Sequence, residues 1–238
     1  MTKVYEIGSY MLRNYVLETP GGFIAIDTGY PGGADKFAKR FEKFAPLKEL
    51  KYIFLTHAHD DHAGFLGELL SMTDAKVILN PVGLPVLEAG ENAVPPGSGY
   101  SSRLAASFGV FKKEFRFPPV QVGNRGIFMN TEADQFFHTI GLPLRILFLP
   151  GHTSDSIGLL NEETGELFCG DAAMNAVISR QRHTIWVDDA EAFGQSWDVM
   201  LAAKPSKIIP AHGNPFKPQD LRKYRHFLKG HSLISMKA

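Results

Sequence analysis

The chain has 238 residues, of which 44% are hydrophobic and 21% are charged. This balance is typical of a globular protein with a substantial core and excludes a disordered or fibrous chain, so we expect one domain over residues 1–238. The 25 Lys and Arg residues equal the 25 Asp and Glu residues in number. Net charge therefore predicts neither a nucleic acid nor an anionic membrane as a partner.

Two further features bear on the compartment and on the kinds of site that the chain can build. Charged residues interrupt the first thirty positions before an apolar run reaches signal-peptide length, and no later run approaches a membrane span, which predicts a cytoplasmic protein. The only cysteine, Cys169, cannot form an internal disulfide or a multi-cysteine zinc site. Any metal site must therefore use His, Asp and Glu.

Short strands joined by tight turns are predicted for the N-terminal part, with Pro20-Gly-Gly22 as a hairpin-type connection. An amphipathic helix is predicted over Ala34–Phe44, where apolar residues recur at spacings of three and four. Strand and helix then alternate along the chain. The predicted strands are Val4–Ile7, Met11–Leu17, Phe23–Asp27, Leu50–Leu55 and Lys76–Leu79, and a second helix is predicted over Gly64–Leu70.

The segment from Glu91 to Val122 departs from the alternation of strand and helix patterns, and we interpret it as an insertion and a candidate lid. It contains the loop Val94-Pro-Pro-Gly-Ser-Gly-Tyr100 and a predicted short helix from Ser102 to Glu114. Its aromatic residues either line a substrate pocket or pack the insertion onto the body, and the sequence favours neither. They are Tyr100, Phe108, Phe111, Phe115 and Phe117.

Strand and helix patterns resume after the insertion. Strands are predicted at Leu144–Leu149, Ser156–Asn161, Leu167–Cys169 and Lys207–Pro210, and helices at Gln195–Ala203 and Gln219–Lys229.

Three imidazoles and two carboxylates occupy the six positions from His57 to His62. Residues i and i+2 of an extended segment point the same way, so His57 and His59 can direct both rings at one point. Asp61 and His62 follow where the chain turns into a helix, and can face a second point. Since imidazole and carboxylate suit zinc and its first-row neighbours, the cluster has the composition of a two-metal centre.

A solvated turn that happens to be rich in histidine is the alternative, although His-x-His-x-Asp-His arises by chance with odds of roughly one in a thousand. Two metals need further ligands. We expect them at the ends of later strands, where the chain returns to the same edge of the sheet. His152, Asp171 and His212 each follow a predicted apolar strand with Gly or Pro beside them. A backbone that turns closely around a site requires such residues.

With these motifs in this order, the sequence resembles the metallo-β-lactamase superfamily. The resemblance covers nearly the whole chain and implies an α/β fold, a four-layer αββα sandwich in which two mixed sheets face each other with helices outside. The matching motifs are Asp27-Thr-Gly29, Thr56-His-Ala-His-Asp-Asp-His62, Pro150-Gly-His-Thr153, Gly170-Asp171 and His212-Gly213.

The resemblance also implies the roles of individual side chains. Asp27 matches a position that supports the metal-binding loop by hydrogen bonding without being a ligand, and Asp60 is not expected to be a ligand. The implied ligands are His57, His59 and His152 for a first metal ion, Asp61, His62 and His212 for a second, and Asp171 as the bridge between them.

Departures from the pattern narrow the subfamily. The best-known zinc β-lactamases carry cysteine at the second metal, whereas Cys169 lies two residues before Asp171 and is better interpreted as a small buried strand residue. Flavodiiron proteins share the pattern but have glutamate at the position of His59, so electron transfer of the flavodiiron kind is not expected for this chain. The β-CASP nucleases carry a large extra domain that this chain length cannot hold, and the neutral charge argues against tRNA processing.

The activity that the resemblance implies is hydrolysis of an ester, lactone, thioester or related bond in a small-molecule substrate. Two divalent ions would activate a shared water, with Asp61 or Asp171 as the catalytic residue that orients it. Zinc is the expected metal, although the same ligands accept iron or manganese. Two other classes of protein stay open. The first is an oxidoreductase similar to persulfide dioxygenases, in which Asp171 and either His57, His59 or its neighbours would hold one iron. The second is a binding or regulatory protein that retains the metal site.

No proton donor for the leaving group is assigned. His183 follows Asp171 in the chain and could approach the site, but an exposed histidine is the commoner case. Arg180 and Arg182 could bind a substrate carboxylate or phosphate, with a solvated loop as the alternative. His138, His226 and His231 match no motif, and we interpret them as structural or surface residues.

Overall fold

The computed structural model describes residues 3–109, 115–131, 135–179, 181–228, 230 and 232–235. The chain forms two compact units: the first comprises Met1–Ala93 and Phe115–Asn130, and the second Val94–Glu114 and Thr131–Ala238. The expected insertion at 91–122 is therefore shared between the two units. A single domain over 1–238 stays a prediction.

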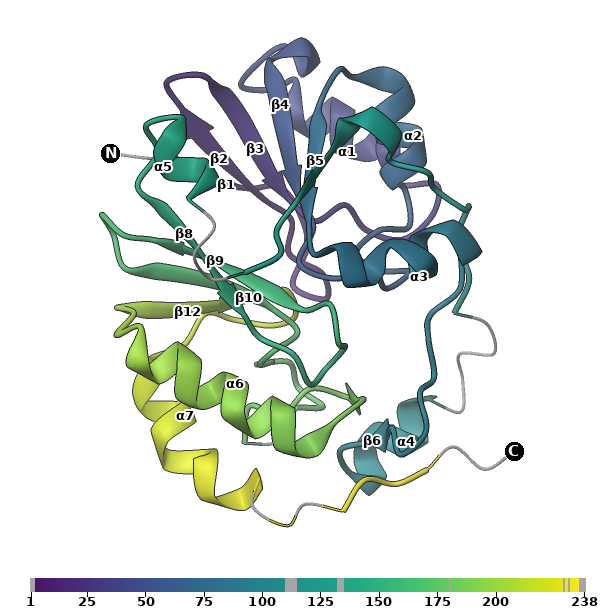
Figure 1. The fold of residues 1–238 in the computed structure, drawn as a ribbon, viewed down its shortest axis with the longest axis vertical. Helices are drawn as coiled ribbons and strands as arrows, with labels where there is room; N and C mark the ends of the chain where they lie inside the picture. Colours follow the sequence, from purple (N-terminus) through teal and green to yellow (C-terminus); the bar gives the residue numbers. More distant parts are fainter. Residues whose placement is uncertain are drawn as a thin grey trace. The chain divides into compact units, whose positions relative to one another are not determined.

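The first unit is built on a mixed six-stranded sheet in the order β1-β2-β3-β4-β5-β7 (Figure 1). The pairs β1–β2 and β2–β3 are antiparallel, whereas β3–β4, β4–β5 and β5–β7 are parallel. The strands are β1 (Lys3–Glu6), β2 (Tyr15–Thr19), β3 (Gly22–Ile26), β4 (Leu50–Phe54), β5 (Lys76–Leu79) and β7 (Gly126–Phe128). The helices of this unit are α1 (Ala34–Phe41), α2 (Leu66–Met72) and α3 (Leu84–Ala89).

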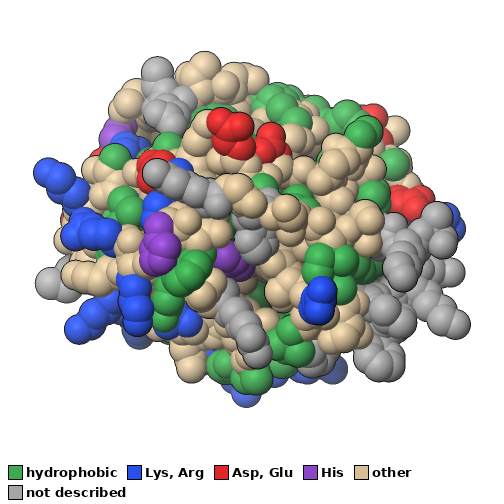
Figure 2. Space-filling model, turned by 90° about the horizontal axis from the view of Figure 1, so that it is seen from below, with side chains coloured by type: hydrophobic (Ala, Val, Ile, Leu, Met, Phe, Trp, Pro, Cys, Tyr) green, Lys and Arg blue, Asp and Glu red, His purple; other side chains and the backbone are tan. Residues whose placement is uncertain are grey.

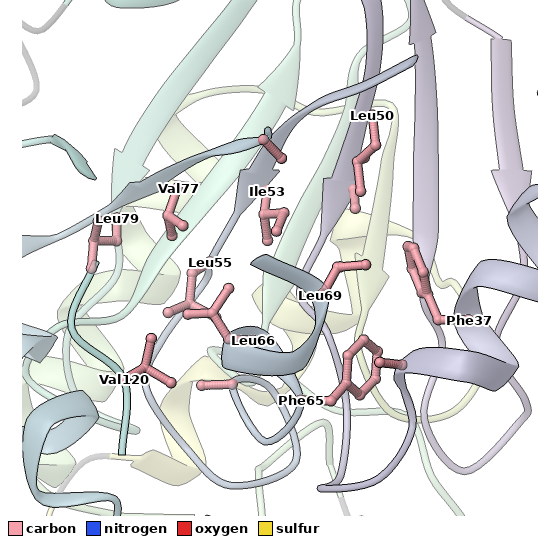
Figure 3. Close-up of a cluster of buried hydrophobic side chains, with 14 of the residues drawn as sticks. Phe37, Leu50, Ile53, Leu55, Phe65, Leu66, Leu69, Val77, Leu79 and Val120 are labelled. Carbon is pink, nitrogen blue, oxygen red and sulfur yellow. The ribbon is translucent and has the colours of Figure 1, made fainter. Parts of the chain in front are cut away.

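Helices α1 and α2 pack on one face of this sheet through their apolar stripes. In α1, Phe37 and Phe41 are buried against Phe23 of β3 and Phe65, which precedes α2. Figure 3 shows the same cluster extending over β4 and β5 and out to Val120. Burial of this apolar surface is the main stabilising contribution to the unit, and it explains why the predicted amphipathic helix forms.

The second unit is built on a mixed four-stranded sheet in the order β12-β10-β9-β8. β8–β9 and β9–β10 are antiparallel and β10–β12 is parallel. The strands are β8 (Leu144–Phe148), β9 (Ile157–Asn161), β10 (Glu166–Gly170) and β12 (Lys207–Pro210), and a separate pair joins β6 (Gly99–Tyr100) to β11 (Trp186–Val187). The helices are α4 (Arg103–Gly109), α5 (Phe136–Thr139), α6 (Ala190–Ala202) and α7 (Pro218–Tyr224), the last continued by a 3-10 helix over Arg225–Leu228.

Helices α6 and α7 cover one face of the second sheet. Trp197 and Phe193 of α6 and Leu221 of α7 are buried in one cluster with Leu167 of β10 and Ile208 of β12. Each unit thus pairs a mixed sheet with a helical layer, as the predicted fold class requires.

Most predicted elements are confirmed, and the differences have local causes. The strand predicted from Met11 begins only at Tyr15, because the preceding residues form a turn in which the Ser9 amide donates to the Leu12 carbonyl. The helix predicted from Gln195 begins five residues earlier, since the Asp189 carboxylate caps its first amides. The short elements β7, α3 and α5 carry too little periodicity to predict.

Part of the predicted insertion lies outside the described residues. The helix predicted over Ser102–Glu114 is observed as α4 up to Gly109, and Phe111 lies outside the described residues. Tyr100 and Phe117 are buried in different units, so the aromatic residues of the insertion do not form one cluster within either unit.

Figure 2 displays one face of the structure, on which both basic and acidic side chains are exposed. Within the described residues, no helix combines the length and the apolar character that crossing a membrane requires.

Candidate metal centre

The histidine cluster of the first unit lies at the carboxyl edge of parallel strands. Asp27 directly follows β3, and His57 follows β4, its parallel neighbour. Carboxyl ends of parallel strands meet at one edge, which is where open α/β sheets place their sites. The structure therefore brings Asp27 to the cluster, as the resemblance implied.

Asp27 fastens both ends of the histidine loop. Its Oδ1 accepts the Thr56 amide at 2.7 Å, and its Oδ2 accepts the Thr56 hydroxyl at 2.8 Å and the His62 Nδ1 at 2.8 Å. Asp27 is buried and has a left-handed backbone with φ of 57°. A non-glycine residue in this region costs free energy, and such strain concentrates at functional sites.

These hydrogen bonds determine which ring nitrogen can act as a metal ligand. A carboxylate only accepts, so the proton of His62 lies on Nδ1 and the lone pair on Nε2. The Thr56 hydroxyl donates to Asp27 and therefore accepts from the Nδ1 of His57 at 3.0 Å. Both rings thus keep Nε2 for a ligand, a pattern typical of metal-binding histidines.

The other predicted ligands of this unit lie beside those two rings. The ring centroids of His57 and His59 are 4.8 Å apart and those of His57 and His62 are 3.9 Å apart. The Oδ1 of Asp61 lies 3.7 Å from the Nε2 of His62, and its Oδ2 lies 3.4 Å from the Tyr30 hydroxyl. The first unit therefore gathers three imidazoles and one carboxylate.

The second unit gathers the remaining three predicted ligands at one sheet edge, because β8, β10 and β12 run in the same direction. Asp171 lies between the two histidines: its Oδ2 is 3.7 Å from the Nε2 of His152 and its Oδ1 is 3.5 Å from the Nε2 of His212. The Nδ1 of His152 donates to the Trp186 carbonyl at 2.7 Å. This leaves the Nε2 of His152 for a ligand as well.

Glycines next to these ligands allow the close turns that the sequence predicts. Gly151 has φ of 129°, and a Cβ there would lie 2.2 Å from the Phe193 amide nitrogen. Gly213 has φ of 84°, and a Cβ there would lie 2.0 Å from the Asn175 carbonyl oxygen. A larger residue at either position would displace the backbone of the neighbouring ligand.

The donor atoms fit first-row divalent ions. Each unit offers imidazole nitrogens and carboxylate oxygens at a sheet edge, which are the ligands of zinc, iron and manganese centres. Cys169 is buried in the core cluster of the second unit. Burial, and to a smaller extent the nearby Asp171, raise the pKa of its thiol, which disfavours the thiolate that a metal requires.

The remaining candidate residues have structural partners. His183 is buried and packs edge-on against Trp197 at 5.7 Å, so the interpretation as an exposed histidine is wrong. Arg182 is partly exposed, and its guanidinium donates to Asp220 at 2.6 Å and also to Asn175, so in this structure the guanidinium is engaged by protein acceptors. Arg180 and His231 lie outside the described residues.

His138 and His226 agree with their interpretation as surface residues. His138 pairs with Glu162 at 2.8 Å, and the His226 ring packs on Phe227 at 3.9 Å.

Three residues near the ligands have no signal in the sequence. Trp186 acts through its carbonyl, Asn92 bonds Asp60, and Asp188 donates its amide to the carbonyls of Gly151 and His152. Burial raises the pKa of the Asp188 carboxyl to about 6, against the opposing effects of Trp186 and His152. Backbone acceptors and partners that are distant in the sequence cannot be read from residue types.

Replacing Asp27 with Asn is expected to weaken metal binding about 10- to 100-fold. The amide keeps one acceptor for the Thr56 N–H but presents an NH2 group to two donors, the Thr56 hydroxyl and the His62 Nδ1. Asn tolerates the left-handed backbone, so the change isolates the hydrogen bonds. Zinc affinity measured by chelator competition checks this, and wild-type affinity in D27N would contradict it.

Comparison with known proteins places these features in context. Residues 13–212 match the sequence model described as the Metallo-beta-lactamase superfamily. The protein named "Probable metallo-hydrolase YflN" of Bacillus subtilis (strain 168) is 24% identical over 226 residues, which cover 85% of this chain and 80% of that protein. The "Thioesterase pkgB" of Emericella nidulans is 25% identical over 227 residues, which cover 92% of this chain and 52% of that protein.

Similar solved structures extend over almost the whole chain. The structure described as "Peroxy diiron species of chemotaxis sensor ODP" has a TM-score of 0.66 at 15% identity and covers 98% of this chain and 92% of that chain. At this identity, the likeness shows a shared fold.

Proposed function

Because this chain belongs to the metallo-β-lactamase superfamily and has its α/β fold, we propose that it is a hydrolase with a dinuclear metal centre. The observation that carries the proposal is the Asp171 carboxylate, whose two oxygens approach the Nε2 atoms of two different histidines. A carboxylate in this position can bridge two ions. The proposed ligands are His57, His59 and His152 for the first ion, Asp61, His62 and His212 for the second, and Asp171 for both.

When bound, two divalent ions supply Lewis acidity and lower the pKa of a water molecule towards neutrality. The chain's own part is to orient the reactants. Asp61 or Asp171 would accept a hydrogen bond from the attacking water and direct its lone pair at the substrate carbonyl carbon. Asp27 keeps the proton of His62 on Nδ1, and the Trp186 carbonyl does the same for His152.

The proposed substrates are small molecules with an ester, lactone, thioester or related bond. The names of two relatives, a probable metallo-hydrolase and a thioesterase, support hydrolysis of this class of bond. Since the chain spans about half of the thioesterase, the thioester is one member of the class to test and not a specific assignment.

The test is to reconstitute metal-free protein with zinc and assay it against a panel of aryl esters, acyl lactones and acyl thioesters. We expect hydrolysis of at least one class, its loss on removing the metal, and its return on adding zinc. Activity that is the same in metal-free and zinc-loaded protein would contradict the proposal.

Iron chemistry is the second candidate, favoured by the di-iron description of a structural neighbour. The same nitrogen and oxygen ligands accept iron, and an oxidoreductase similar to persulfide dioxygenases would use it. Elemental analysis of freshly purified protein, together with oxygen consumption in the presence of a persulfide, distinguishes these candidates: zinc with hydrolysis supports the first proposal, and iron with oxygen uptake the second.

A further inference from the structure

The side chain of Asn92 is bound to the middle of the histidine loop. The Asp60 amide donates to the Oδ1 of Asn92 at 2.9 Å, and the Nδ2 of Asn92 donates to the Oδ1 of Asp60 at 2.9 Å. Asp60 is buried and stands between two proposed ligands, His59 and Asp61. We propose that Asn92 is a positioning residue that holds these two ligands in their binding orientation, an inference that rests on the proposed metal centre.

The other supports of the loop act at its ends. Asp27 holds Thr56 at the start, and the amide and hydroxyl of Thr28 both donate to the His62 carbonyl at 2.7 Å. The turn between them is closed by the His62 amide, which donates to the His59 carbonyl at 2.9 Å. Asn92 adds a support at the middle, from a position 32 residues further along the chain, and binds both the backbone and the side chain of Asp60.

Asn92 is itself held in place by its backbone. Its amide donates to the Phe115 carbonyl at 2.9 Å, and the Phe117 amide donates to the Gly90 carbonyl at 2.9 Å. These bonds form a short antiparallel bridge at the point where the chain leaves the first unit and returns to it. A side chain on such a bridge has a defined direction, which a positioning residue requires.

The predicted effect concerns charge and hydrogen bonding and is not limited to packing. In Asn92→Asp, a second carboxylate faces Asp60, so the two groups repel each other and the Nδ2 bond is lost. In the double variant Asp60→Asn with Asn92→Asp, an amide again faces a carboxylate. The bond between the two side chains can then form in the reverse sense, and the backbone amide of residue 60 can still donate to the side chain of residue 92. The pair of variants therefore separates the bonding from the mere presence of a side chain.

The experiment measures the dissociation constant of zinc by competition with a chromogenic chelator, using the full chain. N92D is expected to bind zinc about 10- to 100-fold more weakly than the wild type, and D60N/N92D to recover most of the loss. Asn92→Ala removes both bonds without adding charge and carries the test if N92D does not fold. The control is Glu91→Gln, which breaks only the exposed pair with Arg116 on the same bridge and should leave the affinity unchanged.

Thermal unfolding of the metal-free proteins shows that the variants being compared are folded. Wild-type zinc affinity in folded N92D, or no recovery in the folded double variant, would overturn the positioning role alone. A wild-type chain that binds no zinc would instead overturn the proposed metal centre, so the two failures are distinguishable.

Discussion

Replacing Asp171 with Asn is expected to lower kcat/KM for hydrolysis by more than about 100-fold. Losing a residue that only supports a metal ligand typically costs about 10- to 100-fold, and Asp171 is itself the proposed ligand of both ions. The amide matches the carboxylate in size but is neutral and offers only one oxygen with lone pairs. The amide therefore cannot place a metal-binding oxygen beside the Nε2 of His152 and another beside the Nε2 of His212. The bound metal should fall from two ions towards one per chain.

The measurement is steady-state kinetics on the best substrate of the panel, with elemental analysis of the same sample. Asp198→Asn in the same unit is the matched control, since that carboxylate pairs with Arg225 at 2.6 Å and is more than half exposed. Its activity and metal content should equal those of the wild type. Full activity and two ions per chain in D171N would show that the carboxylate is not a bridge.

The second large effect is on stability: Trp197→Ala is expected to lower the free energy of unfolding by about 3–5 kcal/mol. Trp197 is fully buried in α6, packs against Phe193 at 5.8 Å, and donates its Nε1 to the Ala172 carbonyl at 2.8 Å. Truncation leaves a large cavity in the core of the second unit. It also removes the partner of a carbonyl in the residue that follows Asp171.

Two further variants separate these contributions. Trp197→Phe keeps an aromatic ring but leaves the Ala172 carbonyl without its donor, which should cost about 1–3 kcal/mol. Phe227→Ala, at a residue that is 44% exposed, should change stability by less than about 0.5 kcal/mol. Urea unfolding at equilibrium measures all three, and equal midpoints for W197A and the wild type would contradict the prediction.

Much of the fold could be predicted from the sequence, because its periodic patterns are strong. The amphipathic pattern at 34–44 and the apolar runs at 50–55 and 207–210 each gave the observed kind of element. Boundaries were less predictable, since they depend on interactions outside the pattern. The Asp189 cap extends α6 at its start, and the turn at Ser9 shortens β2.

The donor residues of the proposed centre could also be read from the sequence, together with the strand ends that carry them. A metal centre needs nitrogen and oxygen donors at close spacing, and His57 to His62 display them in a single motif. The burial and the hydrogen-bond partners of individual side chains could not be predicted from the sequence in this way. His183 was interpreted as the exposed kind of histidine and is buried, and Arg182 is only partly exposed and bonds Asp220.

By itself, the sequence determined the class of fold, the types of donor atom and their order along the chain, because these follow from residue identity and periodicity. The tertiary structure alone decided which ring nitrogen of His57, His62 and His152 carries the proton and what holds the histidine loop. Those properties depend on hydrogen bonds that the Asp27 carboxylate and the Trp186 carbonyl accept and that Asn92 donates and accepts, with partners 32 to 35 residues away in the sequence. A hydrogen bond requires its two atoms to meet in space, and only the folded chain brings them together.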